Sequence, residues 1–339
     1  MNDLITFRPS PEQYSYTFGG REAVARVRPG DLLRVSTEDC FGGAVQSVDV
    51  LPSEVCKLPL LNPVTGPFHV EGAEPGDTLA LHVVSITPSR DWAVSSTFPL
   101  FGALTSTHTT ATLQPPLEER VWIYDIDQAA GVVRWSARRS EHVIELPLDP
   151  MHGTMGVAPA AFEARSTLVP DAHGGNLDTP ELRAGVTVYF GVNVPGALFS
   201  LGDGHARQAE GEVCGVAVEA AMDTVLAVEL IKGVYTPWPR IENDRELISI
   251  GCAKPLEDAF RISQHDLVTW TAGLTGLEVL DAYQLISQIG KAPAGNVVDP
   301  NYTMLAKVEK RWLPALTAYD GVHARLRELA AGVGVPSPE

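Results

Sequence analysis

The sequence predicts an α+β fold that is mostly β, built from duplicated sandwich-like or barrel-like units with a few helices towards the C-terminus. The 30 glycines and 26 prolines are spread along all 339 residues, as turn residues between many short strands would be. Apolar residues recur mainly with strand periodicity, and helical spacing appears only late in the chain. Strands and helices do not alternate and no glycine-rich phosphate loop occurs, so a doubly wound nucleotide-binding fold is not expected.

Two similar turns introduce the strands of the first half. Arg-Pro-Gly-Asp at 28–31 precedes LLRVST, and Glu-Pro-Gly-Asp at 74–77 precedes TLALHVVSI. Proline presets φ at the second turn position and glycine supplies a positive φ at the third. The second strand is apolar on both faces, so we expect it to be buried. The repeat of turn and strand suggests two related β-units.

Strands continue through the middle of the chain and helices follow. Residues 185–194, 196–201 and 212–231 are rich in Val, Phe and Tyr and are punctuated by Gly or Pro. Apolar residues at helical spacing predict a helix over 278–291, and residues 318–332 predict an amphipathic C-terminal helix. We expect one unit over 1–339, with two β-rich halves, about 1–150 and 151–339, as the finer division.

Composition narrows the class of protein. The formal charge of −17 argues against a nucleic-acid partner, which would require a basic face. No run of about 18 apolar residues predicts a membrane span. The N-terminus lacks a basic region followed by an apolar stretch, so we expect no signal peptide and a cytoplasmic location. The four cysteines are widely spaced without a C-x-x-C pair, which favours reduced thiols over a zinc knuckle or disulfides.

One segment, residues 196–219, concentrates groups that can bind a metal. Asp203 and His205 are two residues apart between glycines, so an extended backbone would point both side chains the same way. A carboxylate and an imidazole suit zinc. Glu212 and Glu219, seven apart, would face opposite ways unless a bulge intervenes. The alternative is structural, with Asp203 capping a turn and His205 as an ordinary polar turn residue.

Four other segments carry candidate residues. His152 stands among small residues in MHGTMGVAP, and Asn176 and Asp178 lie in the loop sequence HGGNLD. Asp39 closes the first turn-and-strand unit, and His69 lies two residues before a glutamate. Each of these, taken singly, also fits a purely structural role.

Together these segments resemble the acetamidase/formamidase family. The matching stretches occur in the family's order and cover most of the chain: VSTEDCFGG (35–43), NPVTGPFHVEGAEPGDTL (62–79), MHGTMGVAP (151–159), GGNLD (174–178), PGALFSLGDGHARQAEGEVCGVAVE (195–219) and DAYQLISQ (281–288). The resemblance implies hydrolysis of a short amide to a carboxylate and ammonia, a largely β fold with a duplicated arrangement, a homo-oligomer and a divalent metal in the site.

The resemblance and the motif spacing give a residue-level hypothesis. The cation would be zinc, with calcium as the alternative, since carboxylates and carbonyls are the ligands calcium prefers. Glu212, with His152, would move the proton that hydrolysis requires. The expected metal ligands are Asp39, Asp203, His205 and Glu219, and the expected substrate-binding residues are His69, Asn176 and Asp178.

One departure and several alternatives remain. Where the family commonly reads Gln-Gly-Asp-Gly-Glu, this chain has Gln208-Ala209-Glu210-Gly211-Glu212, which predicts a different acyl preference if the loop shapes the pocket. Alternatives are a metal hydrolase for another C–N bond and a non-catalytic β-rich protein with structural calcium. A metal oxygenase of the cupin type is disfavoured, because the paired His-x-His ligand motif of such enzymes is absent from this sequence. A thiol route through Cys214 is disfavoured because a strand interior favours an inert cysteine.

Overall fold

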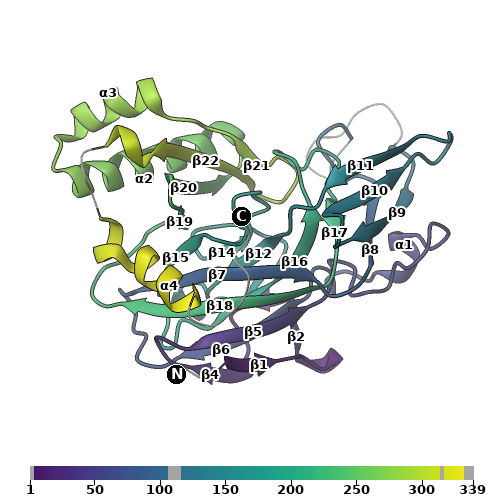
Figure 1. The fold of residues 1–339 in the computed structure, drawn as a ribbon, viewed down its shortest axis with the longest axis horizontal. Helices are drawn as coiled ribbons and strands as arrows, with labels where there is room; N and C mark the ends of the chain where they lie inside the picture. The colour runs from purple at the N-terminus through teal and green to yellow at the C-terminus, as the bar shows by residue number, and fades with distance from the viewer. Residues whose placement is uncertain (1–3, 106–115, 314–316, 332–339) are drawn as a thin grey trace.

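The computed structural model describes residues 4–105, 116–313 and 317–331. Two large sheets dominate it (Figure 1). In order across the first sheet lie β1 (Leu4–Phe7), β5 (Leu32–Thr37), β18 (Met222–Ile231), β7 (Thr78–Pro88), β15 (Thr187–Gly191), β19 (Arg240–Glu242), β20 (Glu246–Ala253), β22 (Tyr302–Glu309) and β21 (Ala294–Asn296).

The second sheet carries most of the polar segments singled out above. Its order is β11 (Val143–Pro147), β10 (Val132–Ser136), β9 (Arg120–Asp127), β8 (Trp92–Thr97), β17 (Val218–Glu219), β16 (Phe199–Arg207), β12 (Met151–Gly156) and β14 (Gly174–Asn176). Strand β6 (Val64–Val70) also pairs with β16, and with β2 (Tyr14–Ser15) and β4 (Ala25–Val27). A small third sheet joins β3 (Thr17–Phe18) to β13 (Arg165–Ser166).

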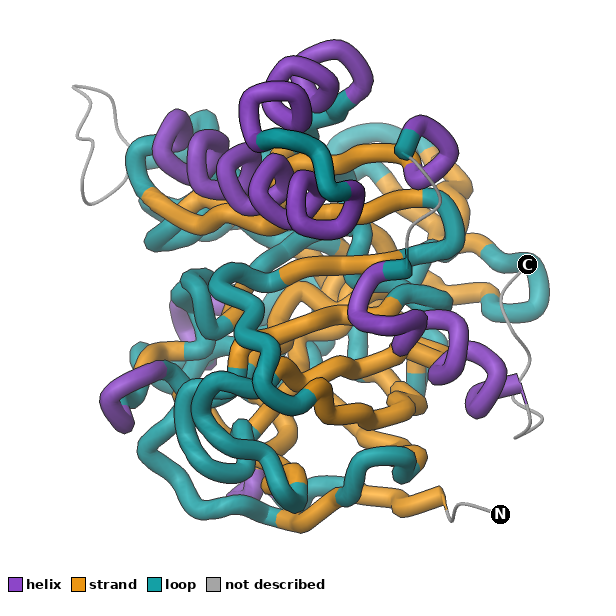
Figure 2. Tube along the Cα trace, turned by 90° about the vertical axis from the view of Figure 1, so that its left-hand side faces the viewer, coloured by secondary structure: helices purple, strands orange, loops and turns teal. Residues whose placement is uncertain are grey.

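The helices lie mainly at the C-terminal end. They are α1 (Pro52–Val55), α2 (Leu256–Thr275), α3 (Val279–Ile289) and α4 (Val322–Ala331), with short 3-10 turns at 11–13, 160–162, 310–312 and 318–321. Helix α2 packs on β20 and β22, and α4 packs on β7 and β18 (Figures 1 and 2). The mostly-β prediction and the helices expected near 278–291 and 318–332 are confirmed. Within the described residues neither sheet closes into a barrel. No helix of this described part is both long and apolar enough to span a membrane.

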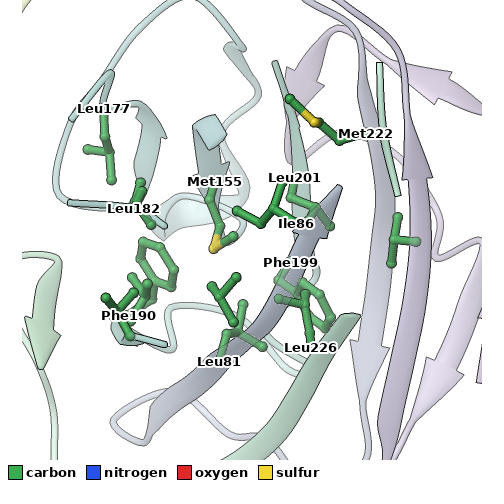
Figure 3. Packing of buried hydrophobic residues seen from close by; sticks show 14 of the residues in the cluster. Leu81, Ile86, Met155, Leu177, Leu182, Phe190, Phe199, Leu201, Met222 and Leu226 are labelled. Carbon is green, nitrogen blue, oxygen red and sulfur yellow. The ribbon is translucent and has the colours of Figure 1, made fainter. Parts of the chain in front are cut away.

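One hydrophobic core joins the two large sheets. Figure 3 shows side chains from both packed together. Those from the first sheet include Leu81, Ile86, Phe190, Met222 and Leu226, and those from the second include Met155, Phe199 and Leu201. Strand β7 is buried on both faces except near its end, as its sequence predicts. In the first sheet an early strand lies between two later ones, since β7 pairs with β18 on one side and β15 on the other.

Candidate metal and amide site

Strand β16 places Asp203 and His205 at the centre of a buried polar cluster. His205 Nε2 lies 3.4 Å from Asp203 Oδ1 and 3.3 Å from Glu219 Oε2 of the neighbouring β17. Their side chains are at most 4% exposed. A Cβ at Gly204 would come within 2.2 Å of Met222, so this glycine lets the adjacent strand approach. The two side chains of the D-x-H motif thus lie close together in the structure.

Asp178, Glu212 and Asp299 bring three more buried carboxyl groups to the cluster. Asp178 Oδ1 lies 3.9 Å from His205 Nε2. The Asn176 side-chain amide donates to Asp178 Oδ2 at 2.6 Å and to Asp299 Oδ2 at 2.8 Å. Asp299 follows β21, far from the other residues in sequence, and no motif in the chain singled it out.

Asn62 and Thr154 complete the polar network beneath these carboxylates. Asn62 Nδ2 donates to Asn176 Oδ1 at 2.7 Å and to Thr154 Oγ1 at 2.9 Å. The Thr154 hydroxyl in turn donates to Asp203 Oδ2 at 3.1 Å. Sequence reasoning missed Asn62 and Thr154 as site residues, although both lie inside stretches that carry the family resemblance.

The backbone at the site is unusual. Asn62, Asp178, Asp203 and Glu212 have φ values of 58°, 40°, 56° and 44°, in the left-handed region that non-glycine residues seldom adopt. Such conformations cost free energy, and they cluster where a site must hold side chains in fixed places. At Asp203 this backbone replaces the simple extended geometry assumed from the sequence.

The electrostatics of the cluster are dominated by excess negative charge. Among the described residues, His205 is the only cationic side chain forming an ion pair with any of its five carboxyl groups. Burial opposes protonation of His205, but the carboxylates of Glu219 and Asp203 outweigh it and raise its pKa well above the usual range. Burial raises the pKa of Glu219 to about 7.

Asp203 is the exception among the five carboxyl groups, because the charge of His205 outweighs the effect of burial and lowers its pKa. The pKa values of the remaining three rise, as that of Glu219 does. Burial, and then neighbouring carboxylates, raise the pKa of Asp178 and of Glu212 well above the usual range. Burial likewise raises the pKa of Asp299. Carboxylates held so close together away from water repel one another unless protons or a cation offset their charge.

The donor set fits a divalent cation. Asp178 Oδ1 and Glu219 Oε2 are buried oxygens that accept no hydrogen bond from any described residue, an arrangement that costs free energy without a ligand. Two groups of three side chains have ligand atoms all within 4.8 Å of one another: Cys40, Asp203 and Glu219, and Asp178, His205 and Glu212. Carboxylate oxygen and imidazole nitrogen are ligands that zinc accepts.

Gln208 fixes the orientation of the histidine. Its Nε2 amide donates to the backbone oxygens of Asp178 at 2.7 Å and Gly295 at 3.3 Å, and carbonyl oxygens can only accept. The amide oxygen therefore faces His205 Nδ1, at 2.9 Å, and accepts a hydrogen bond from it. With the proton held on Nδ1, Nε2 is the ring nitrogen available to a cation.

Three residues expected at the site lie in other environments. Asp39 Oδ1 accepts hydrogen bonds from the amides of Phe41 and Gly43, and its Oδ2 pairs with Arg90. It takes part in neither group of ligand atoms. His69 contacts Arg26 at 3.5 Å, and it lies towards the opposite end of the β6–β16 pairing from Asp203.

His152 lies close to the cluster but uses both ring nitrogens elsewhere. Nδ1 donates to the backbone oxygen of Gly202 at 2.8 Å, and Nε2 accepts from the Thr224 hydroxyl at 2.7 Å. Burial lowers its pKa to about 4, so the ring is neutral near pH 7. The expected substrate-binding residues Asn176 and Asp178, by contrast, are both part of the cluster.

The loop between β16 and β17 corrects two sequence-based expectations. Cys214 was placed in a strand interior, but residues 208–217 form a loop and Cys214 is exposed there. Strand propensity predicts a strand over 212–231, but β18 begins only at Met222. Gly211, Glu212 and Gly215 have positive φ values, which bend the chain into a turn before it. Ala209 and Glu210 replace the Gly-Asp that is common in the family. Ala209 does not adopt a positive φ, so it does not strain the loop, and the Glu210 side chain is exposed, so it does not line the cluster.

Comparison with known proteins assigns the chain to a protein family. The sequence profile described as Acetamidase/Formamidase family matches residues 21–162 and 150–255. The chain therefore belongs to the acetamidase/formamidase family.

Individual relatives agree. The chain is 28% identical to a formamidase of Methylophilus methylotrophus over 62% of this chain and 61% of that protein. It is 25% identical to an acetamidase of Mycolicibacterium smegmatis over 62% of this chain and 64% of that protein. The chain thus matches about three fifths of the length of these curated relatives.

Solved structures match over more of the chain. The crystal structure of an acetamidase from Yersinia enterocolitica is 40% identical, with a TM-score of 0.87, covering 93% of this chain and 94% of that one. An acetamidase from Bacillus halodurans is 29% identical, with a TM-score of 0.80, covering 90% and 98%.

Proposed function

We propose that this protein hydrolyses a short-chain aliphatic amide, of the formamide or acetamide type, to a carboxylate and ammonia, and that the reaction depends on a divalent cation. Family membership and the names of its relatives support the substrate class. The observation that carries the cation is the buried cluster of carboxylates around His205, in which Glu219 Oε2 accepts no hydrogen bond from the described residues.

In this proposal Asp203, His205 and Glu219 hold the cation. His205 Nε2 lies 3.4 Å from Asp203 Oδ1 and 3.3 Å from Glu219 Oε2, so one ion could contact all three side chains after a small adjustment. An imidazole ligand favours zinc over calcium, which prefers oxygen alone. Asp39 instead shapes the turn beside the site, through its bonds to the Phe41 and Gly43 amides.

The cation would supply Lewis acidity, polarising the amide carbonyl and making a nearby water more acidic. The remaining tasks belong to the protein. Glu212, 7% exposed at the edge of the cluster, carries the proton from the attacking water to the amide nitrogen. Burial raises its pKa, which makes its carboxylate a stronger proton acceptor than that of an exposed glutamate. The Asp178 Oδ1 atom is free to accept an N–H of the substrate amide.

Gly153 supports the choice of a small substrate. A Cβ on this residue would lie 2.3 Å from Asp178 Oδ1 and 2.4 Å from Asp203 Oδ2, in the space between the two carboxylates. A bare backbone therefore leaves room at the place where the carboxylates converge. We assign proton transfer to Glu212 rather than His152 because both nitrogens of His152 are already hydrogen-bonded.

The test is ammonia release from formamide, acetamide and propionamide, with and without a chelator, together with elemental analysis of the purified protein. Turnover should be lost with the metal and restored when the metal is added back. Asp203→Asn and Glu219→Gln should lose metal and turnover together. Glu212→Gln should keep the metal and lose turnover, whereas the matched Glu210→Gln, in an exposed position of the same loop, should change neither.

Two outcomes would contradict the proposal. Full metal occupancy with no ammonia from any amide would point to another C–N bond or to a structural ion. Ammonia release that survives complete removal of metal would exclude a metal-dependent reaction.

The assembly and the compartment also stay predictions. We propose a homo-oligomer, as the family resemblance implies, and light scattering of the purified protein measures it. A mass equal to one chain would contradict it.

A further inference from the structure

The turn after β5 presents two neighbouring residues, Asp39 and Cys40, in different roles. Both carboxylate oxygens of Asp39 already have partners. One accepts hydrogen bonds from the backbone amides of Phe41 and Gly43 at 2.9 and 3.0 Å, and the other pairs with Arg90. These bonds fix the turn that carries Cys40. The sequence predicts Asp39 as the ligand from this turn, but the side chain of the turn that lies near the Asp203 and Glu219 carboxylates is that of Cys40.

The Cys40 thiol faces the cation-binding carboxylates. Its sulfur and carboxylate oxygens of Asp203 and Glu219 all lie within 4.8 Å of one another. The Cys40 backbone oxygen accepts the Asn62 amide at 2.8 Å, and the Asn62 side chain donates to Asp203 Oδ2 at 3.3 Å. One asparagine thus ties the cysteine to a ligand strand, so their proximity is built into the hydrogen-bond network.

An unsatisfied oxygen points to a ligand at this place. Glu219 Oε1 accepts the amide of Ala217 at 2.9 Å, but Oε2 accepts no hydrogen bond although the side chain is only 2% exposed. A thiolate beside these carboxylates would be repelled unless a cation lay between them. A metal ion bound to Glu219 Oε2 and to the Cys40 sulfur would neutralise the carboxylate charge and give both atoms a ligand contact.

We infer that Cys40 is a thiolate ligand of the cation held by Asp203, His205 and Glu219, an inference that rests on the proposed metal dependence. On binding, the S–H bond is broken, a sulfur–metal bond forms, and the proton leaves to solvent. Thiolate sulfur selects zinc over calcium or magnesium, which prefer oxygen ligands. Cys40 thus determines which metal the site takes.

The other three cysteines provide internal controls. Cys252 is buried beside the Thr303 hydroxyl, at 3.8 Å, and the Cys214 thiol donates to the Val216 backbone oxygen at 3.0 Å in an exposed loop. Cys56 is half-buried like Cys40 and packs against the same apolar cluster. Among the described residues, none of these three belongs to a group of potential metal ligands.

The test is X-ray absorption at the zinc edge of the zinc-loaded full-length protein, which reports ligand type without relying on a variant. We expect one sulfur neighbour at about 2.3 Å, with the remaining neighbours oxygen or nitrogen. The cobalt(II)-substituted protein should show a sulfur-to-metal charge-transfer band in the near ultraviolet. Cys40→Ser should abolish both signals and weaken zinc binding by about 100-fold. Cys56→Ser should keep both.

Each other outcome has a distinct meaning. Stoichiometric zinc with only oxygen and nitrogen neighbours in the wild-type protein would overturn the thiolate ligand and leave the proposed function standing. A sulfur signal that persists in Cys40→Ser and vanishes in Cys56→Ser would assign the ligand elsewhere and overturn the inference. Absence of any bound divalent metal, with ammonia still released, would overturn both.

Discussion

His173 is buried without a hydrogen-bond partner, and this makes its replacement a sharp test. The side chain is 3% exposed, its ring lies 5.3 Å from that of Phe18, and neither ring nitrogen is hydrogen-bonded. Burial lowers its pKa to about 4. We expect His173→Leu, which is similar in volume and has no polar atoms, to make the protein less sensitive to acid.

The size of the effect follows from the shift. The folded pKa of about 4 lies below the unfolded value of about 6.5, so between these values the unfolded chain binds the extra proton. Stability is therefore lost as the pH falls through 6.5, and the loss is complete below 4. One group shifted this far contributes a loss of about 2 kcal/mol at pH 5 and about 3 kcal/mol in full.

The assay is reversible urea unfolding of both proteins at pH 7, 6 and 5. At pH 7 the variant should be about 1 kcal/mol more stable, since two unsatisfied nitrogens are removed. Its advantage should grow to about 3 kcal/mol at pH 5. His82 and His152, whose pKa values burial also lowers to about 4, contribute equally to both proteins and cancel. Stability curves that stay parallel from pH 7 to 5 would refute the reasoning, and the exposed His265→Gln should give such parallel curves.

Further predictions concern the residues around the site. Gly153→Ala should lower the free energy of unfolding by about 1–3 kcal/mol and reduce bound metal, because its Cβ would press on two buried carboxylates. Unchanged metal content in the folded variant would count against the cluster as the binding site. Gln208→Met should weaken zinc binding by about tenfold or more, because His205 loses the acceptor that holds its proton on Nδ1. Unchanged zinc affinity would show that Gln208 does not orient the ring. Arg90→Met should lower the unfolding free energy by about 3 kcal/mol in urea, since it leaves the buried Asp39 unpaired, and a change below about 1 kcal/mol would contradict that account.

Much of the fold was predictable because it depends on local chemistry. Each Pro-Gly-Asp turn leads into a strand, β5 and β7, because proline and glycine favour the turn whatever surrounds it. Helices α3 and α4 carry an apolar face that requires only helical spacing to be recognised. The longest helix, α2, was missed, because polar residues such as Asp266 occupy its buried face.

The reason lies in tertiary pairing. Asp266 accepts two hydrogen bonds from the Arg240 guanidinium, at 2.8 Å each, and a third from Ser249 at 2.6 Å. A charged residue inside an apolar helix face interrupts the periodic pattern. Its burial becomes favourable only through partners on the strands that the helix covers, here Arg240 and Ser249. Sequence spacing contains no record of that partner.

The same division holds for the site. The sequence by itself predicted Asp203, His205 and Glu219 as ligands, because they lie in one short segment on and beside one strand. The family resemblance followed from motifs of this kind. Only the tertiary structure decided that Asp39 holds a turn while Cys40 faces the carboxylates, and that Asp299 joins them from the C-terminal part of the chain. Neighbours along a chain share a segment, but which of them points inward depends on hydrogen bonds from distant residues, and these form only when the sheets and loops pack together.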